Sequence, residues 1–183
     1  MRTIFTGLSP NAEVDDVWLA FSLLLKPWKW KQGIAIQKLE QVFQTMLPIK
    51  HAYTFASGRS CLLALLSSLG LNKGDEVLLQ AYTCVAVPDP VLWADLKPVY
   101  VDIEERGYNM SPENLEKKIT PKSKVLIIQH TFGIPSDIEN LMAIAQKHNL
   151  MVIEDCAHAL GATYKGKQVG TFGDASFFSF GRD

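Results

Sequence analysis

The feature that most constrains the fold is an alternation, from about residue 53 onward, between short β-rich runs and segments with helical periodicity. The strand-like runs cover residues 52–55, 76–79, 98–101, 125–128, 150–154 and 176–180. Alternation of this kind predicts βαβ units, in which each crossover helix returns the chain to the same edge of a sheet.

Residues 125–128 (Val-Leu-Ile-Ile) are apolar at every position, as strands are when helices cover both faces of a parallel sheet. The helical segments carry start signals: Ser57-Gly58 before the apolar run 61–69, Ser111-Pro112-Glu113, and Asp137 before an amphipathic stripe. We therefore expect an α/β fold with three layers and a mostly parallel sheet.

The first 50 residues follow a different pattern. Apolar residues between 34 and 46 predict one amphipathic helix after Gly33. The apolar run 17–25 has about half the length needed to cross a bilayer, so we interpret it as a buried or interfacial helix. We expect an N-terminal helical arm over 1–50 and a sheet domain over 51–183. The arm carries several tryptophans and is a candidate for packing on a partner subunit.

Composition excludes several classes of protein. The chain has 183 residues, a net charge of −1, 20% charged and 48% hydrophobic residues, which is typical of a globular domain. The absence of a basic excess argues against a nucleic-acid partner, and no run is long enough to span a membrane. Cys61, Cys84 and Cys156 are widely spaced and odd in number, which favours a reducing cytoplasm and predicts no metal site.

Ligands of open parallel sheets bind beyond the carboxyl ends of the strands, so the loops after strands are the first candidates. One candidate is Ser57-Gly58-Arg59-Ser60, because a helix N-terminus presents free N–H groups to a phosphate and Gly58 permits close approach. Plain helix capping is the alternative. Ser179, near the end of the last predicted strand, could hold a phosphate oxygen or bond only to the backbone.

Another candidate is the segment 152–158, where Glu154 and Asp155 end a buried strand and His158 follows. Buried carboxylates are costly unless they have partners, so Asp155 and His158 could share a ligand pocket. Alternatively, the two acids cap a following helix and His158 is a buried, hydrogen-bonded imidazole. Metal binding lacks a third ligand at a convincing spacing.

Taken in order, these segments resemble the DegT/DnrJ/EryC1/StrS sugar aminotransferases, which are pyridoxal-phosphate enzymes of fold type I. The resemblance covers nearly the whole chain and is carried by four blocks: Ser57–Ser60, Gly74-Asp75-Glu76-Val77 through Tyr82-Thr83-Cys84 to 97–102, 152–158, and 165–174 leading into Phe177-Phe178-Ser179-Phe180. It implies that residues 51–183 belong to a cofactor-binding large domain.

The resemblance also implies roles for individual residues. Gly58, Arg59, Ser60 and Ser179 fall where the family holds the phosphate of pyridoxal 5'-phosphate. Asp155 falls where a carboxylate pairs with the pyridine nitrogen, which keeps the ring an electron sink. His158 falls near the ring hydroxyl. Cys84 occupies the position where relatives often place an aromatic ring against the cofactor, and a thiol gives up most of that stacking contact.

The family places its Schiff-base lysine at position 184, directly after Asp183. We therefore expect this chain to be an N-terminal fragment with an incomplete large domain and without the C-terminal small domain. The whole protein is expected to transfer an amino group, with glutamate as donor, to a nucleotide-linked keto sugar in cell-surface polysaccharide biosynthesis. We expect it to form a cytoplasmic homodimer when full length.

Two alternatives remain open. A histidine at position 184 would indicate the sugar dehydratase branch of the same superfamily. A fragment without the lysine could instead be a non-catalytic binding protein.

Overall fold

The computed structural model describes residues 13–30 and 34–181, which fall into two compact units. One unit comprises Phe55–Ser179, and the other comprises Met1–Thr54 with Phe180–Asp183. Gly33, expected to precede a helix, and Asp183 lie outside the described residues. No helix within the described ranges is long and apolar enough to cross a membrane.

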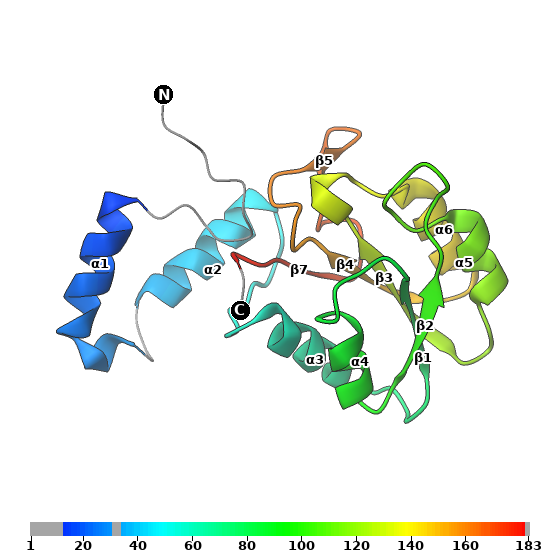
Figure 1. Ribbon diagram of the computed structural model, residues 1–183, viewed down its shortest axis with the longest axis horizontal. Coiled ribbons are helices and arrows are strands. Elements are labelled where there is room, and N and C mark those ends of the chain that lie inside the picture. The colour runs from blue at the N-terminus through cyan, green and yellow to red at the C-terminus, as the bar shows by residue number, and fades with distance from the viewer. Residues whose placement is uncertain (1–12, 31–33, 182–183) are drawn as a thin grey trace. The chain divides into compact units, whose positions relative to one another are not determined.

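The larger unit is built on a sheet of five parallel strands (Figure 1). The strands lie in the order β2-β1-β3-β4-β7. Their bounds are β1 Glu76–Gln80, β2 Lys97–Val101, β3 Ser123–Gln129, β4 Met151–Asp155 and β7 Ala175–Phe177. Pro98 lies in β2, at the edge of the sheet, where a residue without an N–H is tolerated. The prediction of an α/β fold with a mostly parallel sheet is confirmed.

Helices cover both faces of this sheet, as Figure 1 shows. α3 (Gly58–Ser68) and α4 (Pro88–Trp93) pack on one face, against inward-pointing residues such as Val77 and Leu79. α5 (Pro112–Lys118) and α6 (Ile138–Lys147) pack on the other face, against Leu78, which lies between Val77 and Leu79 in the sequence. Because successive strand residues point to opposite faces, strands that are apolar throughout feed two cores at once.

The predicted helix starts are confirmed by their caps. Ser57 Oγ accepts a hydrogen bond from the Ser60 N–H at 3.2 Å, and Ser111 Oγ accepts one from the Asn114 N–H. Asp137 likewise caps α6. Each cap satisfies an N–H group that the first turn of a helix leaves without a partner.

Two strand predictions are wrong. Residues 52–55 form no strand, because the Thr54 N–H is bonded to the Glu40 side chain rather than to a neighbouring strand. The predicted strand 176–180 ends at Phe177, because its pairing partner β4 ends at Asp155 and offers no further ladder. The remaining elements of this unit are a single turn, η2 (Thr131–Gly133), and a hairpin of β5 (Thr163–Tyr164) with β6 (Lys167–Gln168).

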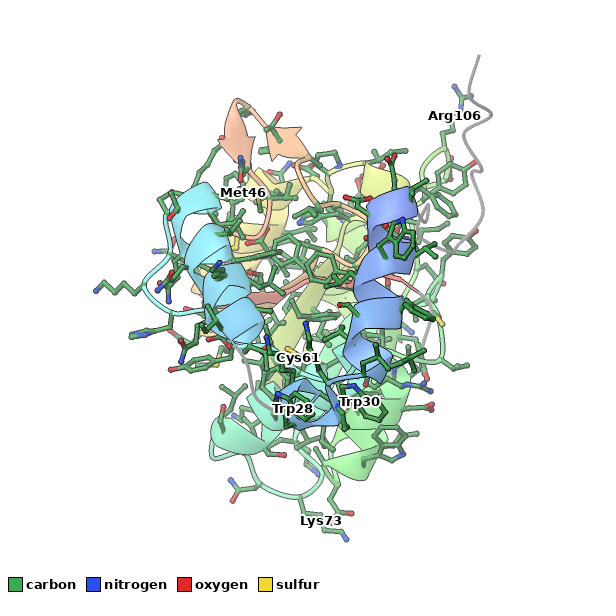
Figure 2. All side chains as sticks on the ribbon, turned by 90° about the vertical axis from the view of Figure 1, so that its left-hand side faces the viewer. Trp28, Trp30, Met46, Cys61, Lys73 and Arg106 are labelled. Atoms are coloured by element: carbon green, nitrogen blue, oxygen red, sulfur yellow. The ribbon has the colours of Figure 1, made fainter. Side chains whose placement is uncertain are left out.

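The smaller unit contains α1 (Val14–Leu24), a single 3₁₀ turn η1 (Pro27–Lys29) and α2 (Ile34–Met46). Trp28 and Trp30, labelled in Figure 2, lie where α1 gives way to α2, and the Trp30 indole donates to the Leu23 carbonyl at 2.7 Å. None of the α1 residues is buried, so of the two readings of 17–25, a buried or an interfacial helix, the buried one is wrong for this chain and the interfacial one stays a prediction. Trp18 is two-thirds exposed, because none of the described residues covers the apolar side chains of this helix.

Candidate functional site

The strand order changes direction between β1 and β3. The chain leaves β1 toward β2 on one side and leaves β3 toward β4 on the other, so the connections diverge between these two strands. Ligands of open α/β sheets bind at such a switch point, beyond the carboxyl ends of the strands. α3 ends shortly before β1 begins, so it runs opposite to the strands and directs its N-terminus toward this same edge.

The N-terminus of α3 carries Gly58, Arg59 and Ser60. The Gly58 N–H donates to no described residue, and a Cβ atom at Gly58 would meet nothing within 4 Å. The Ser60 hydroxyl is engaged in the cap, donating to the Ser57 carbonyl at 2.8 Å. The site therefore offers main-chain donors and the helix dipole to an anion, while Ser60 also serves the cap.

Asp155 ends β4 and is 4% exposed. One carboxylate oxygen accepts the Ala157 N–H at 3.0 Å, and the other accepts no hydrogen bond from the residues that the structure describes. Burial raises the pKa of Asp155 to about 6, against the opposing effects of the Ala157 N–H and of His158 and His130. A buried carboxylate with one unpaired oxygen is a strong acceptor for a protonated donor on a ligand.

Glu154, the preceding residue, is fully buried and satisfied within the protein. Its oxygens accept the N–H groups of Gly170, Phe172 and Gly173 at 2.7–2.8 Å. Burial raises its pKa, but the hydrogen bonds from His130 and from these three N–H groups outweigh that effect and leave the pKa below its usual value. Glu154 therefore fixes the turn before β7 rather than facing a ligand.

His130 completes this buried arrangement. Its Nδ1 accepts the Ser136 N–H at 3.2 Å, so the ring proton resides on Nε2, which lies 3.1 Å from Glu154 Oε2. His130, Glu154 and Cys156 lie close enough together to resemble metal ligands. The nitrogens of His130 and the oxygens of Glu154 are already in hydrogen bonds, so we interpret the cluster as structural rather than as a metal site.

His158 does not match the buried imidazole considered from the sequence. It is exposed, no helix follows β4 for Glu154 or Asp155 to cap, and its ring stacks on Phe132 at 6.0 Å with an interplanar angle of 2°. Phe132 has a φ of +55°, a conformation that costs a bulky residue about 1–3 kcal/mol. Strain of this kind persists where surrounding contacts enforce it, often beside functional sites.

The other predicted site residues lie on loops. Cys84 is exposed in the loop after β1, which is tied to β3 by the Thr83 hydroxyl donating to Gln129 Oε1 at 2.5 Å. Ser179 is half-buried and follows β7. The strand topology thus directs Cys84, Asp155, His158 and Ser179 to the carboxyl edge of one sheet.

Sequence reasoning missed a group of aromatic side chains at this edge. Tyr82, Tyr108 and Phe132, which we call the aromatic wall, follow β1, β2 and β3, and their ring centroids are 5.5–6.4 Å apart. Each ring is about half exposed. The available signal was that each aromatic residue comes shortly after a strand, which places it at the ligand edge of a parallel sheet.

This combination of parallel sheet, helix N-terminus and buried acceptor agrees with a match over residues 15–182 to the DegT/DnrJ/EryC1/StrS aminotransferase family. The chain belongs to this family. Among its relatives, it is 40% identical over 153 residues to GDP-perosamine synthase of Escherichia coli, covering 84% of this chain and 42% of that protein. It is 37% identical over 166 residues to the UDP-N-acetyl-3-dehydro-alpha-D-glucosamine 3-aminotransferase of Acidithiobacillus ferrooxidans, covering 91% and 45%.

Solved structures of aminotransferases share the fold. An aminotransferase from Psychrobacter cryohalolentis superposes with a TM-score of 0.85 at 33% identity, covering 93% of this chain and 43% of that one. PseC of Helicobacter pylori, an aminotransferase in pseudaminic acid biosynthesis, gives 0.83 at 29% identity, covering 94% and 46%. The chain therefore spans less than half the length of these relatives.

Proposed function

We propose that the protein to which this chain belongs is a pyridoxal-phosphate-dependent aminotransferase that acts on a nucleotide-linked keto sugar, with glutamate as the amino donor. The observation that carries the proposal is Asp155, a buried carboxylate at the carboxyl edge of the sheet with one oxygen unpaired among the described residues. The names of the relatives, GDP-perosamine synthase and a UDP-sugar 3-aminotransferase, support the substrate class.

The residues present fit the cofactor. Asp155 would accept a hydrogen bond from the protonated pyridine nitrogen, and its charge would favour that protonated form. The N–H groups at the start of α3 would receive the phosphate, with Gly58, Arg59, Ser60 and Ser179 around it. His158 would face the ring hydroxyl, and Cys84 would lie against the ring. When bound, the cofactor supplies an electron sink for the substrate carbanion.

The solution state and location form part of the same proposal. A homodimer would cover the exposed apolar side chains of α1 and α2, among them Trp18 at 68% and Ile34 at 69% exposure. Light scattering on the full natural protein tests the dimer, and a monomer at micromolar concentration would contradict it.

A reducing cytoplasm suits the three free cysteines. A role in cell-surface polysaccharide biosynthesis is supported by a relative named as a spore coat polysaccharide biosynthesis protein in Bacillus subtilis.

The test of the proposed reaction is the amino-donor half-reaction of the full natural protein. With pyridoxal phosphate and glutamate, it should release one 2-oxoglutarate per bound cofactor when no sugar is present. Asp155→Asn should reduce the rate about a hundredfold, because an amide cannot hold the ring nitrogen protonated as a carboxylate does. Asp95→Asn, at an exposed ion pair with Lys73, is the control and should match the wild type. No release of 2-oxoglutarate by the wild-type protein would refute the proposal.

A further inference from the structure

A buried glutamine at the end of β1 links the loops around the switch point. Gln80 is 1% exposed. Its Nε2 lies 2.6 Å from the Tyr82 carbonyl oxygen and 3.1 Å from the Tyr108 carbonyl oxygen. It also lies 2.9 Å from the Thr131 hydroxyl. The two N–H groups of one side-chain amide are thus shared among three acceptors on separate segments of the chain.

The network itself fixes which way this amide points. Two of the three oxygens near Nε2 are main-chain carbonyls, which only accept hydrogen bonds. Turning the amide over would place Oε1 against both of them, so the nitrogen must face the loops. The Thr131 hydroxyl also accepts from Gln129 Nε2 at 3.0 Å, which joins the end of β3 to the same network.

Each partner of Gln80 lies in a loop that carries one ring of the aromatic wall. Tyr82 follows β1, Tyr108 follows β2, and Thr131 immediately precedes Phe132 after β3. The loop after β3 is held at a second point, because the Thr131 N–H donates to Asn109 Oδ1 at 3.0 Å. The spacing of the three rings is therefore set by contacts of Gln80 with two main-chain carbonyls and one hydroxyl, and by the contact of Asn109 with the Thr131 N–H.

The oxygen of the Gln80 amide indicates that the role of this residue lies in the hydrogen bonds that its nitrogen donates. Gln80 Oε1 is buried and has no hydrogen-bond partner among the described residues. An unpaired buried carbonyl is unfavourable, and an apolar side chain of similar volume would avoid it. A glutamine that only filled space would destabilise the sheet. A glutamine that holds three loops through its nitrogen offsets the free-energy cost of its unpaired oxygen.

The aromatic wall leads directly to a predicted cofactor residue. The Phe132 ring is parallel to the His158 imidazole within 2°, and a side chain at Gly133 would come within 3.1 Å of the His158 carbonyl oxygen. The path of the 131–133 turn therefore constrains the positions of both the ring and the main chain of His158. Gln80 contacts that turn through Thr131.

We propose that Gln80 is a positioning residue for the cofactor site: it holds the three loops of the aromatic wall, and through Phe132 it sets the orientation of His158. This inference rests on the proposed function for the identity of the ligand. The positioning of the loops themselves is independent of that function.

The test measures pyridoxal phosphate affinity and loop order in the full natural protein. Gln80→Met keeps the volume of the side chain but removes both the donors and the unpaired oxygen. Gln168→Met is the matched control, because Gln168 has the same kind of unpaired, buried Oε1 but lies in β6, outside the site. Each substitution is made in the wild type and in His158→Ala, and the dissociation constant is read from the spectrum of the bound cofactor.

Gln80→Met should raise the dissociation constant for pyridoxal phosphate about tenfold in the wild type and less than about twofold in His158→Ala, because the effect acts through His158. Hydrogen exchange should rise in residues 82–84, 107–109 and 131–133. Gln168→Met should change neither quantity. A purely structural role would instead give the same loss of affinity in both backgrounds, and that result would overturn the proposal.

Two further outcomes are decisive. If Gln80→Met does not fold, Thr131→Val removes one of the three acceptors with little change of shape, and an unchanged dissociation constant in that variant overturns the proposal. If the wild type binds no pyridoxal phosphate, the proposed function fails. Hydrogen exchange alone then decides the positioning role: equal exchange in Gln80→Met and Gln168→Met would count against it.

Discussion

The two sides of the end of β4 make a sharp contrast. On one side Glu154 is enclosed by His130 and three main-chain N–H groups, which hold its pKa below the usual value. On the other side Asp155 has a single N–H partner, and burial raises its pKa to about 6. The two carboxylates are adjacent in sequence and similarly inaccessible. The two carboxylates differ in the number of hydrogen-bond donors that the fold supplies, not in how deeply they are buried. Glu154 has a structural role, whereas Asp155 keeps an oxygen available to a ligand.

The largest expected effect is on the Glu154 side. Glu154→Gln keeps the shape but sets an NH₂ group against N–H donors, so the free energy of unfolding should fall by about 3–5 kcal/mol. Urea denaturation measures it. Glu139→Gln, at an exposed ion pair with Lys165, is the control and should stay close to the wild type. Similar losses of unfolding free energy in the two variants would show that the donors around Glu154 do not distinguish it from an exposed acid.

A smaller effect, with a distinctive pH dependence, is expected at Asp155 in the cofactor-free protein. Its folded pKa of about 6 exceeds the unfolded value of about 3.9, so the folded state binds more protons between those values. The contribution of Asp155 to stability is therefore favourable below about pH 4 and is lost as the pH rises through about 6, a difference of about 2–3 kcal/mol.

Asp155→Asn removes this titration, so its stability relative to the wild type should increase between pH 4.5 and pH 7, by at most about 2–3 kcal/mol. Urea denaturation at a series of pH values measures the difference. Glu154 has the opposite sign, because its lowered pKa means that stability is lost only as the pH falls below its unfolded value. A stability difference that does not vary with pH would show that Asp155 is not the unsatisfied acid described above.

The smallest expected effect concerns the start of α3. Ser57→Ala removes the cap from the Ser60 N–H and should lower the free energy of unfolding by about 1 kcal/mol. Ser68→Ala removes an exposed hydroxyl at the other end of the same helix and should have little effect. Thermal denaturation of the two variants compares them, and an equal shift would show that the cap does not stabilise the start of α3.

Much of the fold followed from local patterns. Uniformly apolar runs, caps at Ser57, Ser111 and Asp137, and the order of the segments were enough to predict the parallel sheet and its helices. The prediction failed at 52–55 and beyond Phe177, because whether a β-rich run becomes a strand depends on a neighbour with free hydrogen-bonding groups. That information is not local in the sequence.

The candidate site stood out in part from local patterns as well. Asp155 did so because a buried carboxylate at the end of a strand needs a partner, and the α3 start did so because a helix N-terminus with Gly58 offers N–H groups to an anion. The different fates of Glu154 and Asp155 could not be read from the sequence, since the donors to Glu154 come from residues 170–173 and 130. Gln80 gave no signal either, because its three partners lie in loops separated along the chain and meet only through the strand order.

The hydrogen bond between His130 and Glu154 makes the imidazole a built-in sensor of opening. Its proton lies on a nitrogen that is sealed from solvent, between a fully buried ring and a fully buried carboxylate. It can exchange with water only when the structure around it opens, so its lifetime in deuterated solvent records how often that opening occurs. A proton resonance from this one ring would thus report the opening of the structure around His130 and Glu154 without any label or ligand.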